Sequence, residues 1–284
     1  MRYFAACSLI DLRMPSAYEV LKKQSAFGDE EIRLLCNIAF ARDKKELSPQ
    51  SFEKIGQCQK AFFRALVAKH IPLAGNEAVI EKLLQDDDDR VRVQAAARLR
   101  GTLDERAERE LVRGFSHASS PVRILSISTF WNFENIQKKM AEKEFLSFSR
   151  QRWQEHGEKL IEATESADIA MKRVAILRLS EVGPKEASEI VARHLRDSHM
   201  TVRFQAVLSL GQRMEMERVM PIILDSKEVI LLRLAPFIGS RRSSKKPSRE
   251  LAPQFMQLIK DKDDRVRMVA RSEEHTSELQ SRQS

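Results

Sequence analysis

The sequence predicts an all-α protein, a right-handed α-solenoid of about eight to nine stacked helix pairs. Three observations lead to this prediction. The composition is 42% hydrophobic and 32% charged, with nine glycines and nine prolines among 284 residues, which favours helices. A short motif recurs about every 31 residues. Acidic or serine-rich turns precede most of its copies. Such recurrence indicates one helix pair per repeat, packed only on neighbouring repeats.

The motif is an apolar residue, here termed the anchor, followed by arginine and then by small or apolar residues four, six and eight positions after the anchor. Val202-Arg203 begins its clearest copy. The other anchors are Met1, Ile32, Phe63, Val91, Val122, Met171, Ile230 and Val266. The match is loose at Phe63 and at Ile230, where Leu231 replaces the arginine.

Successive anchors are 31, 31, 28, 31, 49, 31, 28 and 36 residues apart. The step of 49 residues predicts an irregular or inserted helical unit at 134–165. Repeat arrays are therefore expected at 1–133 and 166–270.

Each anchor is expected to lie at the start of the second helix of its repeat. Asp and Ser in the preceding turn cap amides of the first helical turn and suit its positive end. Such turns occur at 86–89, 116–120, 197–198, 225–226 and 261–264. Pro121 lies one residue inside such a start, where proline is tolerated. Amphipathic first helices are expected upstream, at 78–84, 189–195 and 254–259.

The pattern Asp-x-x-x-Val-Arg-x-x-Ala occurs at 87–95 and, shifted by one residue, at 197–206. It resembles the HEAT-repeat family, in particular the short variant of phycobilisome lyase-like repeats. The resemblance implies a HEAT/armadillo-like superhelix that mostly binds other macromolecules. It also implies that the repeat arginines link adjacent repeats through polar contacts; these are Arg2, Arg33, Arg92, Arg123, Arg203 and Arg267.

The two ends of the chain carry separate expectations. Met1-Arg2 is already in register with the motif, so the chain is expected to begin inside a second helix as a fragment of a longer solenoid. Residues 271–284 resemble the in-frame translation of a sequencing adapter. We interpret this tail as an artefact outside the fold.

Charge and cysteine content restrict the class of protein. The net charge of +8 raises the odds of an acidic partner, but many arginines stand at one fixed position of the repeat, so the structural interpretation of the charge is the stronger one. The three cysteines, Cys7, Cys36 and Cys58, form neither a disulfide framework nor a CxxC pair, and Cys7 and Cys36 occupy packing positions of the repeat. No apolar run approaches the roughly 20 residues of a membrane span. We expect a cytoplasmic protein.

No catalytic or metal-binding motif is recognisable. HExxH, P-loop, GxGxxG and GxSxG patterns are missing from the sequence. The histidines of the repeat region lack the His-Glu dipeptides of deoxyhypusine hydroxylase, a HEAT-type di-iron enzyme. The run 86–89 lacks the spacing of an EF-hand. We therefore expect no enzyme activity, no cofactor and no metal.

The first functional hypothesis is a non-catalytic scaffold or regulatory protein that binds a protein partner on a concave face lined by the second helices. Arg98, Arg178 and Gln205 are expected to be exposed there. A basic segment at 239–249 is a second candidate surface; its predicted partner-binding residues are Arg241, Arg242, Lys245 and Lys246. A solvated surface loop remains the alternative for this segment.

Two other functions remain open. A basic solenoid resembling DNA glycosylases could bind nucleic acid, with Trp131 and Trp153 stacking on bases and Arg150 and Arg152 contacting phosphates. We favour packing roles for both tryptophans. A bilin lyase-like or chaperone-like role rests on the repeat resemblance alone. A continuous basic surface along the second helices would favour nucleic acid, and scattered charge would favour the scaffold.

Overall fold

A computed structural model describes residues 15–27, 32–34, 36–38, 53, 56–100, 102–213, 215–225, 227, 229–240 and 252–271. The described residues form helices, turns and bends, without a strand. The chain divides into two compact units, residues 1–139 and 140–284. None of the described helices is long and apolar enough to cross a membrane.

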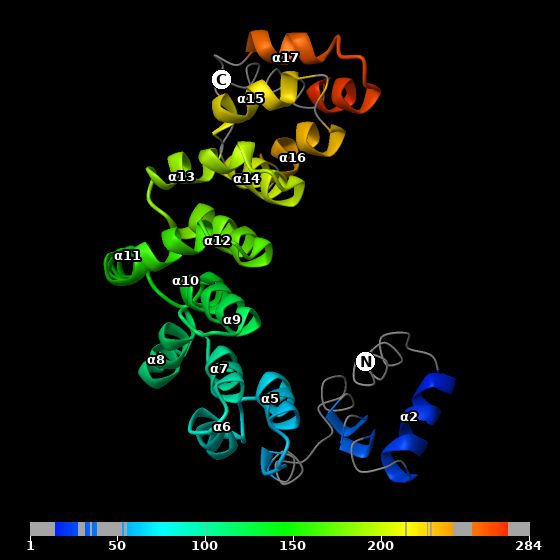
Figure 1. The fold of residues 1–284 in the computed structure, drawn as a ribbon, viewed down its shortest axis with the longest axis vertical. Helices are drawn as coiled ribbons and strands as arrows, with labels where there is room; N and C mark the ends of the chain where they lie inside the picture. The colour runs from blue at the N-terminus through cyan, green and yellow to red at the C-terminus, as the bar shows by residue number, and fades with distance from the viewer. Residues whose placement is uncertain are drawn as a thin grey trace. The chain divides into compact units, whose positions relative to one another are not determined.

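The N-terminal unit contains alternating first and second helices. Its helices are α2 (Pro15–Phe27), α5 (Ala61–His70), α6 (Glu77–Leu84), α7 (Asp89–Arg98), α8 (Glu105–Gly114), α9 (Ser120–Phe130) and α10 (Glu134–Gln137). The second helices α5, α7 and α9 pack in succession, and the first helices α6 and α8 pack against them (Figure 1).

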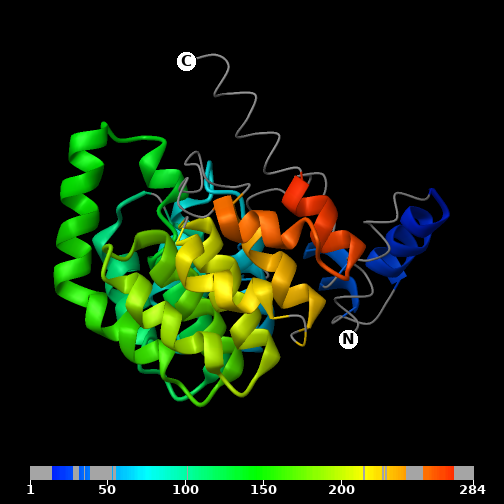
Figure 2. The same ribbon diagram turned by 90° about the horizontal axis from the view of Figure 1, so that it is seen from above.

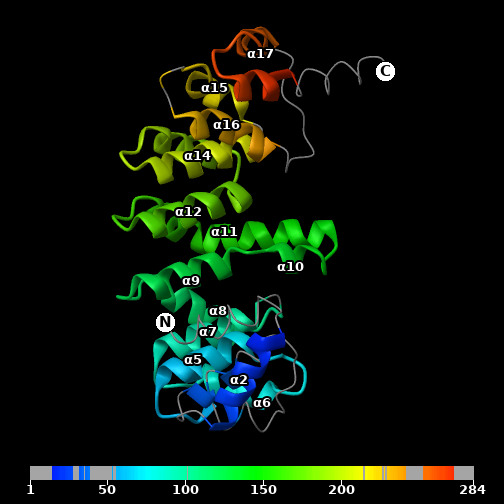
Figure 3. The ribbon, with the colours of Figure 1, turned by 90° about the vertical axis from the view of Figure 1, so that its right-hand side faces the viewer.

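The C-terminal unit repeats this arrangement. Its helices are α11 (Glu142–Thr164), α12 (Ile169–Val182), α13 (Ala187–Arg193), the 3₁₀ turn η1 (His194–Arg196), α14 (Met200–Gln212), α15 (Met216–Leu224), α16 (Ile230–Ser240) and α17 (Ala252–Leu258). Residues 264–271 are also helical. The second helices α12, α14 and α16 pack on one another (Figure 3). The predicted all-α architecture of stacked helix pairs is confirmed within each unit.

The anchors hold the second helices in the core. They are almost fully buried: Phe63, Val91, Val122, Met171, Val202 and Val266 are each at most 4% exposed. In α5, α7, α9, α12 and α14 the helix begins two residues before its anchor. The loose match at Phe63 is therefore a true repeat position.

The anchor predicted at Ile230 is wrong by two residues. Helix α16 begins at Ile230, so its anchor is Leu232, which is 1% exposed. Arg233 then occupies the arginine position that Leu231 seemed to have lost. Spacing alone selected Ile230, because Leu234, Pro236 and Ile238 follow it at the distances of the motif.

The segment 134–165 consists of α10 and the 23-residue helix α11. The N-terminal half of α11 extends beyond α12 (Figures 2 and 3). Trp131, just before this segment, is 1% exposed and packs edge-on against Phe130, with ring centroids 5.1 Å apart. Trp153 lies against Gly157, where a Cβ atom would be 2.9 Å from the indole. These contacts support the packing interpretation of both tryptophans.

Candidate functional site

The most regular polar feature is the turn between the first and second helices of each repeat. The arginine after the anchor folds back, and its Nη1 donates to the carbonyls five and six residues earlier, at 2.7–3.3 Å. The arginines that make this pair of bonds are Arg64, Arg92, Arg123, Arg203 and Arg267. Each guanidinium thereby satisfies carbonyls of the turn that follows the first helix, which would otherwise lack hydrogen-bond partners in the backbone.

An acidic side chain completes most of these turns. Its carboxylate accepts the backbone N–H two residues later, as at Asp86, Asp197, Asp225 and Asp261, with distances of 2.8–2.9 Å. These four aspartates close the turn rather than cap the second helix, although the capping expected of the turns at 86–89 and 261–264 is confirmed. There the cap is the residue two positions later: Asp88 accepts from the N–H of Arg90, and Asp263 accepts from the N–H of Arg265. The corresponding residue before α14, His199, makes no side-chain capping bond.

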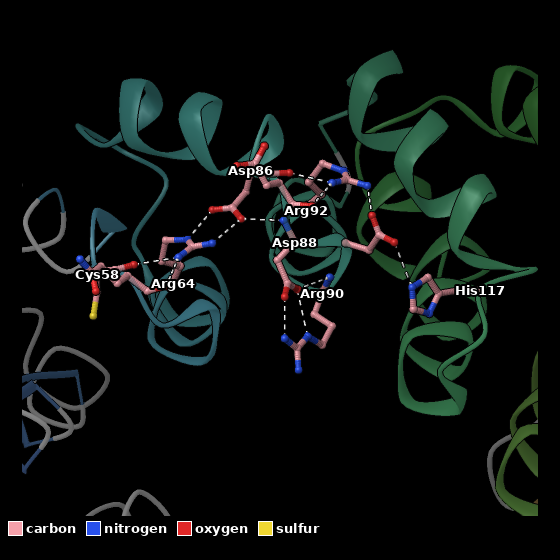
Figure 4. A network of polar contacts seen from close by, with 10 residues as sticks. Cys58, Arg64, Asp86, Asp88, Arg90, Arg92 and His117 are labelled. Atoms are coloured by element: carbon pink, nitrogen blue, oxygen red, sulfur yellow. Dashed lines mark hydrogen bonds and ion pairs between the residues drawn. The ribbon is translucent and has the colours of Figure 1, made fainter.

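Cations of one repeat bind the turn aspartate of the next. Arg64 donates from Nε and Nη2 to Asp86 at 2.6 and 2.8 Å, as Figure 4 shows. Lys172 binds Asp197 at 2.9 Å, and Arg233 binds Asp261. These residues stand at the same repeat position as the predicted arginines. The sequence did contain a signal for these contacts, because an aspartate stands six residues before the arginine of each following repeat. These aspartates are Asp86, Asp197 and Asp261.

These contacts keep the turn carboxylates charged. Burial raises the pKa of Asp86, but hydrogen bonds from Arg64 and from the Asp88 amide outweigh it and leave the pKa below its usual value. The hydrogen bond from Arg90 lowers the pKa of Asp88 to about 2. Each of these two carboxylates is thus paired with an arginine, Asp86 with Arg64 and Asp88 with Arg90.

Arg92 makes the most contacts among the predicted repeat arginines. Besides the two turn carbonyls, it binds Asp89 in its own helix and Glu110 of α8, the latter at 3.1 Å. Of the other predicted repeat arginines, Arg33 is exposed to solvent. Arg2 lies outside the described residues.

The predicted exposure of the three partner-binding residues is wrong for Gln205, which is 8% exposed and donates to Ser209. Arg98 is half-buried, and its Nε donates to the carbonyl of Ile71 at 2.6 Å. Arg178 is half-buried beside Glu181, with Nη1 2.5 Å from the carboxylate. These side chains fell on the helix side that packs, because the assignment used sequence spacing without knowing which positions neighbouring helices cover. Arg241, Arg242, Lys245 and Lys246 lie outside the described residues.

The same positions of successive second helices are open to solvent, and together they form a surface. The residue immediately before the anchor is exposed in every described repeat from α5 onward. Positions two and six residues after the anchor lie on the same side of the helix. In the C-terminal unit these positions are mostly apolar. We term this set the apolar stripe: Leu177, Phe204, Leu208, Leu231, Leu234 and Met268.

The apolar stripe is partly open to solvent. Leu231 and Met268 are 54% and 66% exposed, and the other members are half-buried. Two basic residues, Arg173 and Arg265, share these positions among the described residues of this unit, and Arg265 is paired with Asp263 at 2.7 Å. Charge along this surface is therefore scattered rather than continuously basic.

Two of the four residues proposed to contact nucleic acid, Trp131 and Arg152, are buried. Trp131 is buried and cannot stack on a base. Arg152 is 7% exposed, with its guanidinium 4.5 Å from the Phe148 ring centroid. Arg150 is exposed and Trp153 half-buried.

The described residues contain no cluster of three His, Cys, Asp or Glu side chains able to hold a metal ion. Cys36 is 3% exposed, and burial raises the pKa of its thiol. Its expected packing role is confirmed. Cys7 lies outside the described residues.

Comparison with known proteins gives the repeat its family. A family model described as HEAT repeats matches residues 157–229, which confirms the HEAT-repeat resemblance for this part of the chain. The chain is similar to the solved structure of YibA from Escherichia coli, with 14% identity over 81% of this chain and 93% of that chain, and a TM-score of 0.47. It is also similar to human deoxyhypusine hydroxylase in complex with glycerol, with 15% identity over 98% and 96% of the two chains, and a TM-score of 0.37. No curated protein sequence matches.

Proposed function

We propose that this HEAT-repeat protein is a non-catalytic scaffold that binds an apolar segment of a protein partner along the apolar stripe. The observation that carries the proposal is the contrast between the stripe and the basic composition of the chain. The chain has a net charge of +8, yet the stripe places Phe204, Leu208 and Leu231 at positions open to solvent.

Apolar side chains that are exposed or half-buried at the same positions of successive repeats form the kind of surface that marks a protein interaction site. The second helices supply this surface rigidly, because their anchors are buried and their turns are hydrogen-bonded. A helical partner segment with apolar residues every three or four positions would match the spacing of the stripe along α14.

The same observations weigh against nucleic acid. Binding to phosphates depends on lysine and arginine side chains that are available to them. The repeat arginines Arg92, Arg123, Arg203 and Arg267 instead donate to backbone carbonyls of their own turns.

A photo-crosslinking amino acid at Leu231 tests the proposal. Crosslinking in cells followed by mass spectrometry is expected to give a defined protein partner, and the same probe at the exposed Glu217 of α15 is expected not to. With the purified partner, Phe204→Glu should weaken binding at least about tenfold, equivalent to about 1.4 kcal/mol. Binding that is indifferent to Phe204→Glu would refute the role of the stripe.

A second experiment tests the alternative hypothesis that the protein binds nucleic acid. Fluorescence anisotropy with a labelled DNA duplex is expected to give only weak binding at physiological salt. Tight binding that falls steeply with salt and is lost in Arg173→Glu would support the nucleic-acid hypothesis instead.

A further inference from the structure

We propose that a groove between the first helices α6 and α8 binds a cationic segment of a protein partner, in which a lysine or arginine lies next to an apolar side chain. The groove belongs to the N-terminal unit and shares no residue with the apolar stripe. The inference therefore does not rest on the function proposed above.

The groove has a volume of about 460 Å³ and is open to solvent. It forms where α6, the end of α7 and the start of α8 meet. Its apolar lining consists of Leu73, Ala74, Ile80, Leu84 and Leu99. Ile80 and Leu84 are 3% and 8% exposed, so they form a fixed floor rather than mobile surface side chains.

The polar lining of the groove is predominantly acidic. Three carboxylates, Glu77, Glu81 and Asp104, face one cation, Arg106. The formal charge of the lining is therefore −2, on a chain whose net charge is +8. A groove of this sign selects a positively charged ligand.

Two of these carboxylates already bind a guanidinium. Arg106 donates to Glu81 of α6 and to Asp104, where Nη2 lies 3.1 Å from Oδ2. The hydrogen bond from Arg106 lowers the pKa of Asp104, and two backbone N–H groups at the start of α8 assist it. Carboxylates of the groove thus already bind one guanidinium of the chain, that of Arg106, in the way that we propose for a cation of the partner.

The third carboxylate is the one that this arrangement leaves to a ligand. Glu77 is exposed and lies one helical turn before Glu81 on α6. Among the described residues, its hydrogen-bond donor is the backbone N–H of Gly75, at 3.1 Å. Its charge is not neutralised by the Arg106 bridge.

The combination of floor and rim points to an aliphatic cation. Lysine and arginine lay their methylene groups on apolar surface while the charged end stays at a polar rim. A bare metal ion would gain nothing from the leucine and isoleucine floor. A neighbouring apolar side chain of the partner would cover Leu73 and Leu99, which are half-buried, above the floor of Ile80 and Leu84 while its basic residue bound Glu77.

The test uses the full chain and three fluorescein-labelled peptides. The probe is Gly-Lys-Leu-Lys-Leu-Lys-Gly, and the matched peptides replace both leucines by serine or all lysines by glutamate. Anisotropy is expected to show saturable binding of the probe, at least fivefold weaker binding of the serine peptide, and none of the glutamate peptide.

Two charge reversals decide where the peptide binds. Glu77→Lys should weaken binding of the probe at least tenfold, and Glu158→Lys, an exposed position on α11 with the same change in net charge, should alter it less than twofold. Circular dichroism of both variants checks that they fold, and Glu77→Gln provides a milder change with the same expected direction. Equal effects of the two reversals would overturn the proposal. So would a lack of saturable binding up to about 1 mM peptide.

Discussion

Nε2 of His117 lies 3.1 Å from Oδ2 of Asp89, and Nδ1 of the same ring accepts the backbone N–H of Ser119 at 2.9 Å. His117 therefore occupies the turn position that an aspartate holds before α7, α14 and the last described helix. Since Nδ1 accepts, the neutral ring carries its proton on Nε2 and donates it to Asp89. At this junction the donor therefore lies in the turn, and the accepting carboxylate, Asp89, lies in α7.

This reversal predicts that restoring the common residue destabilises the protein. His117→Asp would keep an acceptor for Ser119 but place a second carboxylate beside Asp89. We expect a loss of about 1–2 kcal/mol in the free energy of unfolding, measured by urea denaturation. His117→Asp combined with Asp89→Asn should recover part of the loss. A single variant as stable as wild type would contradict the assigned contact.

The buried ion pair between Arg233 and Asp261 gives a second prediction. Arg233 is 3% exposed and also donates to the carbonyl of Ile223 at 2.7 Å. Arg233→Ala leaves a carboxylate and a carbonyl without their donor and should cost about 3–5 kcal/mol. Arg265→Ala, which removes the exposed pair with Asp263, should cost far less, because solvent screens an exposed ion pair. Similar values for the two variants in thermal unfolding would contradict the distinction.

His194 predicts how stability responds to pH. It is 5% exposed, and its Nε2 lacks a hydrogen-bond partner among the described residues. Burial lowers its pKa, and Lys172 and Arg193 act in the same direction. The carboxylates of Glu165, 3.8 Å from Nε2, and Asp197 oppose this shift without cancelling it.

Because the folded pKa lies below the unfolded value of about 6.5, the unfolded chain takes up a proton first as pH falls. The stability present above about pH 6.5 should therefore decline below it. His194→Leu should reduce this pH dependence, measured as unfolding free energy between pH 5 and 8. The control His199→Asn changes an exposed histidine and should leave the profile unchanged. Parallel profiles for wild type and His194→Leu would disprove the assignment.

The corrected anchor of α16 gives a fourth prediction. Leu232 is 1% exposed, and Ile230 is half-buried at the helix start. Leu232→Ala should cost about 2–5 kcal/mol, as large-to-small changes in a packed core do. Ile230→Ala should cost clearly less. The opposite order of stability would restore the anchor that spacing alone predicts.

The helix pairs and the turns between them could be predicted from the sequence. The anchor, the arginine and the acidic turn are each weak signals alone, but they recur at the same positions of successive repeats. Pro121 and the anchors Val91, Val122, Met171 and Val202 lie at helix starts as expected. Helix α13 ended earlier than predicted: its last residues form η1, where Asp197 accepts the His199 amide and closes the turn.

Surface assignments were less successful because they depend on which helix side the neighbours cover. Gln205 was expected to be exposed and is buried, whereas Leu208, at a packing position of the motif, is half-buried. The groove was also not predictable, since Glu77 and Asp104 are separated by a whole second helix. Only stacking brings their helices to one opening.

The hydrogen bonds from each arginine to its own turn have a consequence for how such a chain changes in evolution. Arg92 and Arg203 find these carbonyl acceptors five and six residues away, inside the same repeat. A duplicated or deleted repeat therefore carries its turn intact and must re-establish only the contact to its new neighbour. The contact between neighbouring repeats already differs along this chain, since it is made by Arg64, His117, Lys172 or Arg233. We therefore expect sequence changes that accompany the gain or loss of whole repeats to concentrate at this contact.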